Sequence, residues 1–143
     1  MKPAISEKVH IFVRAFCLIL CLGGCNNYYL FKPEMTDGAA QAIERRFETM
    51  VALADMPGMP KVTVRYMKAP DWERAGQADC IEWEIILNYY FVADNLAFSV
   101  AKLVPHEYAH MMSCYSRGHL GADPHDNWWK EAVVQLGGDP EYI

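Results

Sequence analysis

Residues 104–110 of the chain read VPHEYAH, and the segment 106–110 within it has the pattern H-E-x-x-H. Histidines four apart on an α-helix lie on one face, one turn above each other, so His106 and His110 can reach a single metal ion. Glu107 lies beside the first histidine, where a carboxylate can take a proton from a metal-bound water instead of binding the metal. The stretch therefore predicts a helix that carries two metal ligands and a general base.

The sequence before this stretch predicts one helix followed by short strands. Apolar residues recur at helical spacing after Thr36 or Asp37, either of which can cap the helix, and the segment 56–60 (MPGMP) ends it. Apolar and polar residues then alternate over 61–67 and, after a connecting loop, over about 78–88. This alternation predicts two strands, each with one buried and one solvated face.

Helices make up the rest of the predicted domain. A helical stretch begins near Asn95. Pro105 is tolerated in the first turn of a helix, so a new or kinked helix starts there and ends before Gly118. A polar loop leads to a last helix over about 126–136, closed by two glycines. A helix, then short strands, then further helices is the order of an α+β domain.

The predicted site needs a third metal ligand, because a catalytic zinc site holds three protein ligands and leaves a fourth position for water. The candidates are His119, His125 and Glu131. A metzincin site would need a histidine where the chain has Ser116, so that class of zinc protease is excluded.

Several motifs in the second half of the chain follow one another in a fixed order: 75–78 (AGQA), 84–88 (EIILN), 104–110 (VPHEYAH), His125 with Trp129-Lys130, and Leu136-Gly137. Over residues 61–138 this order resembles the SprT-like family of zinc metalloproteins. The resemblance implies a zincin-like minimal metalloprotease domain, with an N-terminal helix, a small sheet, an active-site helix and a C-terminal helix that carries the third ligand. It assigns Zn²⁺ to His106, His110 and His125, and the general base to Glu107.

The chain departs from the family pattern in two places. Asp126 stands where the family commonly has glycine after the third histidine, at a position where the helix dipole favours an acidic residue. Many members also carry a C-terminal zinc ribbon with four cysteines, and no cysteine follows Gly138 here. The sequence therefore corresponds to a short form of the family.

Residues around the motif have less specific predicted roles. Tyr108 is expected to face the core, and Trp128 and Trp129 are expected to pack in it, since large aromatic side chains mostly fill cores. Tyr115 and His119 are the nearby candidates for a second electrophilic group.

Two of the five cysteines, Cys80 and Cys114, lie in the predicted domain. They can form one disulfide in an oxidising compartment, but no sequence argument places them within bridging distance. The commoner alternative is a pair of buried thiols that act as small hydrophobes. Cys114 also lies about two turns from His106, too far to serve as the third ligand.

The first residues have the order of a bacterial lipoprotein signal: a basic start, a short apolar run (AFCLILCL) and the sequence LGGC, which resembles a lipobox. The run is shorter than the roughly 20 residues that span a bilayer. We expect a signal peptide over 1–24, a lipid-modified Cys25, a tether over 25–35 and the metallopeptidase domain over 36–143. The expected location is the bacterial cell envelope, with the membrane reached through the lipid. The other interpretation is an N-terminal helix of a cytoplasmic protein.

The charge of the chain bears on its partners. Its formal net charge is −5, and no basic cluster follows the signal segment, which argues against a nucleic-acid partner. The expected function is hydrolysis of peptide bonds in a protein or peptide substrate, with Glu107 activating a zinc-bound water. The alternatives are a non-catalytic zinc-binding envelope adaptor, which does not need Glu107, and a cytosolic DNA-associated SprT-like protein.

Overall fold

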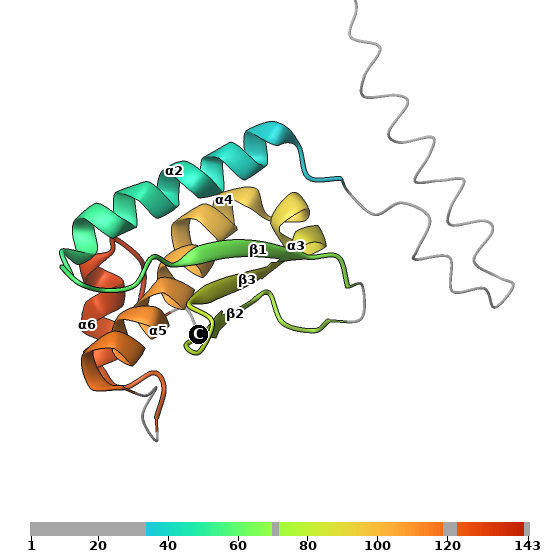
Figure 1. The fold of residues 1–143 in the computed structure, drawn as a ribbon. Helices are drawn as coiled ribbons and strands as arrows, with labels where there is room; N and C mark the ends of the chain where they lie inside the picture. The colour runs from blue at the N-terminus through green and yellow to red at the C-terminus, as the bar shows by residue number, and fades with distance from the viewer. Residues whose placement is uncertain (1–33, 70–71, 119–122, 142–143) are drawn as a thin grey trace, which may run out of the picture. The chain divides into compact units, whose positions relative to one another are not determined.

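The computed structural model describes residues 34–69, 72–118 and 123–141, which form a small α+β domain (Figure 1). The predicted signal peptide 1–24, Cys25 and most of the tether 25–35 lie outside the described residues. Within the described ranges, no helix is long and apolar enough to cross a membrane. The elements, in chain order, are α2 (Asp37–Ala54), β1 (Thr63–Met67), β2 (Gly76–Asp79), β3 (Glu84–Asn88), α3 (Tyr89–Asp94), α4 (Leu96–Phe98), the π-helix η2 (Ser99–Leu103), α5 (Val104–Arg117) and α6 (Asn127–Gln135).

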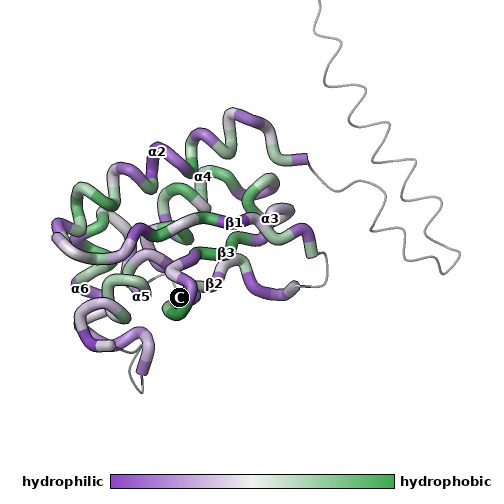
Figure 2. Tube along the Cα trace, in the orientation of Figure 1, coloured by the Kyte–Doolittle hydropathy of each residue, from purple (hydrophilic) through white to green (hydrophobic). Residues whose placement is uncertain are grey.

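Helix α2 confirms the first predicted helix and its cap. The Thr36 hydroxyl oxygen accepts a hydrogen bond from the Ala39 N–H at 3.1 Å, which satisfies one of the free donors of the first turn. One face of the helix is buried through Ile43, Phe47 and Met50. Figure 2 shows the corresponding alternation of hydrophobic and hydrophilic residues along α2.

The sheet has three strands in the order β1-β3-β2, with β1 parallel and β2 antiparallel to β3. In the central strand β3, the consecutive residues Ile85, Ile86 and Leu87 are all buried. Both faces of β3 are therefore covered, whereas the predicted strand had one wet face.

The prediction of one strand over 78–88 is wrong, because the chain turns back in the middle of it to form the β2–β3 hairpin. The Asp79 carboxylate accepts hydrogen bonds from the N–H groups of Ile81 and Glu82 at 2.9 and 3.0 Å. Trp83 has a positive φ of 54°, which is turn geometry. Ile81 is 86% exposed, so the apparent alternation of apolar residues falls on a turn.

Elements α4, η2 and α5 form one helical run with a wide turn just before the H-E-x-x-H segment. The Val104 N–H donates to the Ser99 carbonyl five residues earlier, as in a π-helix. Pro105 has no N–H and its ring would clash with a regular preceding turn, so the wider turn accommodates it. Arg46 on α2 donates from Nε to the Val100 carbonyl of this turn at 3.1 Å. The predicted kink at Pro105 is thus a π-helical turn.

Helix α5 is the centre of the domain and packs against α6, β2 and α2 (Figure 1). It ends at Arg117, before Gly118 with its positive φ of 73°, as predicted. Helix α6 begins after Asp126 and ends at Gln135, close to the predicted range 126–136. The expectation that the C-terminal helix carries the third ligand is wrong in detail, because His125 lies in the turn just before the Asp126 cap of α6 and not on the helix.

Candidate metal centre

Three histidine side chains from α5 and from the turn before α6 converge. His106 and His110 lie one turn apart on α5, and His125 lies just before α6. The His106 Nε2 atom is 3.2 Å from Nε2 of His110 and 3.3 Å from Nε2 of His125. Each of the three offers one ligand atom, and all of these atoms lie within 4.8 Å of one another. The three histidines are therefore close enough to hold one metal ion.

The His106–His110 and His106–His125 nitrogen separations of 3.2 and 3.3 Å are those of neighbouring ligands on a tetrahedral ion. Zinc bonded to imidazole nitrogens at about 2.0–2.1 Å requires neighbouring nitrogens about 3.3 Å apart. Burial, together with the nearby His106 and His125, lowers the pKa of His110 to about 3. His110 is therefore neutral at physiological pH, which is the state in which imidazole binds metals.

The third-ligand candidates differ in where the structure places them. His125 joins the two histidines of α5, as the family resemblance implied, while Glu131 is not part of the cluster. His119 lies outside the described residues.

Trp129 forms a common support for the three histidines. Its side chain is fully buried, and its ring centroid lies 4.8 Å from that of His106, 5.5 Å from that of His110 and 4.5 Å from that of His125. Its indole N–H donates to the His106 carbonyl at 3.4 Å. The prediction of a packing role for Trp129 is confirmed, and the structure adds that it packs on the site itself.

His110 differs from the usual metal-ligating histidine in how its ring is oriented. Such histidines generally donate their second ring N–H to an acceptor. Nδ1 of His110 is buried and has no hydrogen-bond partner among the described residues. Its ring instead stacks on Trp129 with an interplanar angle of 29°. Packing on Trp129, and not a hydrogen bond from Nδ1, therefore orients the ring on this side.

The backbone around His125 is held by carboxylates on both sides. The His125 N–H donates to Asp123 Oδ1 at 3.0 Å. Asp126 caps α6 by accepting from the Trp129 N–H at 3.0 Å, and its second oxygen accepts from Arg117 at 2.5 Å. The Arg117 hydrogen bond is the main reason that the pKa of Asp126 lies below its usual value. Asp126, the departure from the family pattern, therefore connects the end of α5 to the start of α6.

Glu107 points into the region between α5 and the edge strand β2, and it is only 5% exposed. Burial raises its pKa to about 8, while a hydrogen bond from the Ala78 backbone N–H and the positive charge of Arg74 act in the opposite direction. A Cβ atom placed on Gly76 would lie 2.8 Å from Glu107 Oε1. Strand β2 therefore approaches the carboxylate as closely as a glycine allows.

Asn88 at the end of β3 fixes the segment that leads into β2. Its side-chain N–H₂ donates to the carbonyls of Trp72 and Arg74 at 3.0 and 3.3 Å. Its side-chain oxygen accepts from the N–H groups of Tyr90 and Phe91, which caps α3, a helix that the sequence interpretation missed. The Asn88 side chain at the L-N end of β3 therefore holds both the segment before β2 and the start of α3 in place.

A cavity of about 340 Å³ opens over the histidines and Glu107. Its walls come from the 74–78 segment, α5 and the segment before α6: Arg74, Gly76, Gln77, Ala78, His106, Glu107, His110, Pro124 and His125. Arg74 is the one arginine among these lining residues, and it donates to the Gln77 side chain at 3.2 Å. Nothing in the sequence around Arg74 indicated that it would lie at the site. Tyr115, the predicted electrophile candidate, instead donates its hydroxyl to the Pro57 carbonyl at 3.1 Å and does not line the cavity.

The metal-ligand geometry, the buried carboxylate and the cavity are properties of this chain's own structure. No protein-family model, no curated protein and no solved structure matches the chain.

Proposed function

We propose that the protein is a zinc-dependent metallopeptidase that hydrolyses peptide bonds in a protein or peptide substrate. The observation that carries the proposal is that three imidazole nitrogens and one buried carboxylate line the same cavity. A metal site that serves stability alone has no need for a buried carboxylate beside its ligands, and burying one is costly. A hydrolase needs such a group as its base.

His106, His110 and His125 would hold the zinc ion. When bound, zinc would act as a Lewis acid that polarises a carbonyl and lowers the pKa of water toward about 7. Glu107 accepts a proton in the cavity and returns it to the leaving amine. A dication nearby favours the ionised carboxylate, which counteracts the raised pKa that burial gives Glu107.

Arg74 supplies the second electrophilic group in this proposal. Arg74 lines the cavity, and its positive charge is close enough to Glu107 to lower the pKa of that carboxyl. A cation at this wall can stabilise the negative charge that develops on the carbonyl oxygen of the substrate.

A zincin-like fold of the SprT-like type is part of the proposal. It is supported by the H-E-x-x-H helix, by the third histidine just before the last helix and by the small sheet beside the site. An envelope location with a lipid on Cys25 is supported by the signal-like order of the first 25 residues and by a disulfide between Cys80 and Cys114. Disulfides persist mainly in oxidising compartments.

The test is metal analysis combined with hydrolysis of an unstructured protein substrate such as casein, for the wild type and Glu107→Gln. We expect one zinc per chain in both proteins, and about 100-fold or more lower kcat in the variant. Equal background turnover in both, with zinc bound, would instead identify the non-catalytic adaptor. A chain without zinc would contradict both functions.

A further inference from the structure

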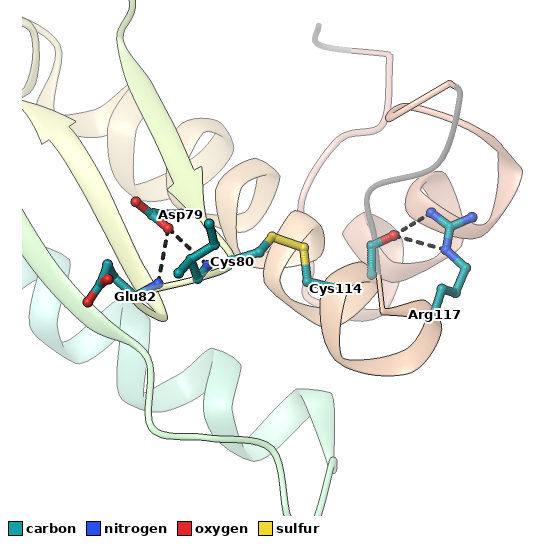
Figure 3. The surroundings of a disulfide bond; sticks show 7 residues. Asp79, Cys80, Glu82, Cys114 and Arg117 are labelled. Atoms are coloured by element: carbon teal, nitrogen blue, oxygen red, sulfur yellow. Dashed lines mark hydrogen bonds between the residues drawn. A yellow bond between two sulfur atoms is a disulfide. The ribbon is translucent and has the colours of Figure 1, made fainter.

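A disulfide between Cys80 and Cys114 joins the β2–β3 hairpin to the helix that carries the metal ligands (Figure 3). Cys80 directly follows Asp79, the last residue of β2, and Cys114 lies one turn beyond His110 on α5. The Cα atoms are 6.0 Å apart, which is typical of a disulfide. The alternative of two free buried thiols is therefore wrong for the described structure.

The hairpin end of this crosslink is locally rigid. The Asp79 carboxylate binds the N–H groups of Ile81 and Glu82, so Cys80 sits in a hydrogen-bonded turn (Figure 3). A movement of Cys80 would consequently be transmitted to β2.

Strand β2 contacts α5 a second time, at Glu107. The Ala78 N–H donates to the Glu107 carboxylate, and Gly76 lies against the same side chain. In the sheet, β2 is a four-residue edge strand with β3 as its partner. An edge strand this short gains little stability from sheet pairing, so its position over α5 depends on these added contacts.

We propose that the Cys80–Cys114 disulfide positions Glu107 for proton transfer by holding β2 against α5. The inference rests on the proposed function, in which Glu107 is the base. The three histidines do not depend on the crosslink, since two lie on α5 itself and the third is held by Asp126 and Trp129. Loss of the disulfide is therefore expected to affect the base and to leave metal binding intact.

The test uses the full chain with Cys17, Cys21 and Cys25 replaced by serine, so that Cys80 and Cys114 are its only cysteines. A phosphine reductant cleaves the disulfide to two thiols and becomes a phosphine oxide, with oxygen and protons from water. We expect kcat to fall by about 10- to 100-fold on reduction, because small displacements of a catalytic group cost this much. KM and the zinc content should not change.

Hydrogen exchange supplies a measurement that does not depend on activity. In the metal-free and the zinc-loaded protein, reduction should accelerate exchange of the 76–80 amides and leave α5 protected. The double variant Cys80→Ser/Cys114→Ser should match the reduced protein and should not respond to the phosphine. Ala78→Pro, which removes the N–H donor to Glu107 from an edge strand and keeps the disulfide, should lower kcat in the same way.

Unchanged kcat and unchanged exchange at 76–80 after reduction would overturn the proposal. Loss of zinc together with faster exchange throughout α5 would also overturn it, since the disulfide would then only stabilise the fold. If the oxidised protein binds zinc but hydrolyses nothing, the proposed function has failed. The exchange measurement then decides alone whether the disulfide holds β2 in place.

Discussion

Glu107 is buried beside the candidate metal ligands, and burying its ionised carboxylate lowers the stability of the fold. In the metal-free protein, burial raises its pKa from 4.5 to about 8. Because the folded-state pKa lies above the unfolded value, unfolding releases a proton between these two pH values. The stability of the metal-free protein therefore decreases as the pH rises from about 4.5 to about 8.

We predict that Glu107→Gln removes this pH dependence, since the neutral amide has the same shape and does not ionise. With the metal removed by a chelator, the wild type should lose about 3 kcal/mol of unfolding free energy from pH 5 to pH 8, at ~1.4 kcal/mol per pKa unit, and the variant should not show this loss. Urea unfolding at both pH values measures the difference. Parallel pH profiles for the two proteins would show that Glu107 keeps an ordinary pKa in the fold.

Gly76 is the second residue whose substitution has a specific predicted effect. A Cβ atom there would lie 2.8 Å from Glu107 Oε1 and 3.0 Å from Leu103 Cδ1, so Gly76→Ala must displace the carboxylate. We expect a loss of about 1–3 kcal/mol of stability and at least about tenfold in kcat, with zinc still bound.

Gly38→Ala is the matched control for this prediction. The nearest atom to a Cβ at Gly38, in the first turn of α2, is Thr36 Oγ1 at 3.8 Å, an ordinary contact. The control should keep full activity and gain up to about 1 kcal/mol from the better helix former. Equal activities of the two alanine variants would contradict the close approach of β2 to Glu107.

At the scale of elements, the connection between α5 and α6 decides where His125 lies. Asp126 both caps α6 and binds Arg117 at the end of α5. We predict that Asp126→Ala destabilises the first turn of α6 and weakens zinc binding by about tenfold or more, as expected for residues that orient a metal ligand. Competition with a chromogenic zinc chelator measures this affinity.

Thr36→Ala is the control, because it removes the N-cap of α2, a helix that carries no metal ligand. It removes the hydrogen bond to Ala39 and should cost about 1 kcal/mol, with no change in zinc affinity. If Thr36→Ala and Asp126→Ala weakened zinc binding equally, the effect would come from general instability rather than from the position of His125.

The elements also show which features are predictable from local sequence. Helix α2 follows from its Thr36 cap, and α5 follows from Pro105 at its start and Gly118 at its end. Helix α6 follows from the glycines after it, and all of these signals act within about one turn. The β2–β3 turn does not follow from such signals, since Ile81 and Trp83 imitate strand alternation while Asp79 closes the turn. Helix α3 was also missed, although Asn88 is an ordinary capping residue.

At the scale of the whole molecule, the unpredicted features are contacts between distant segments. Arg46 on α2 binds the Val100 carbonyl before α5, and it donates to the carbonyls of Leu136 and Gly137 at the end of α6 at 2.7 and 3.2 Å. The Cys80–Cys114 pairing likewise depends on the fold and not on spacing. The histidine triad was predicted because the H-E-x-x-H spacing gave two members and the family resemblance gave His125.

A metal held by His106 and His110 on α5 and by His125 beside α6 would stabilise the whole domain, because the unfolded chain does not hold these three side chains together. At free zinc 100 times the dissociation constant, the gain is about 2.7 kcal/mol. For a domain of about 100 residues this raises the unfolding temperature by more than ~10 °C. Thermal unfolding with zinc and with a chelator measures it.

His125→Ala should lose most of this zinc-dependent increase, because it removes the ligand that joins the second helix to the site. Glu131→Ala, which changes the remaining carboxylate candidate within α6, should keep the full increase. Residues 125 and 131 are six positions apart, so general damage to this part of the domain would affect both variants. Only the loss of a ligand would separate them. Loss of the zinc response in Glu131→Ala with retention in His125→Ala would assign the third ligand to the carboxylate and refute the triad.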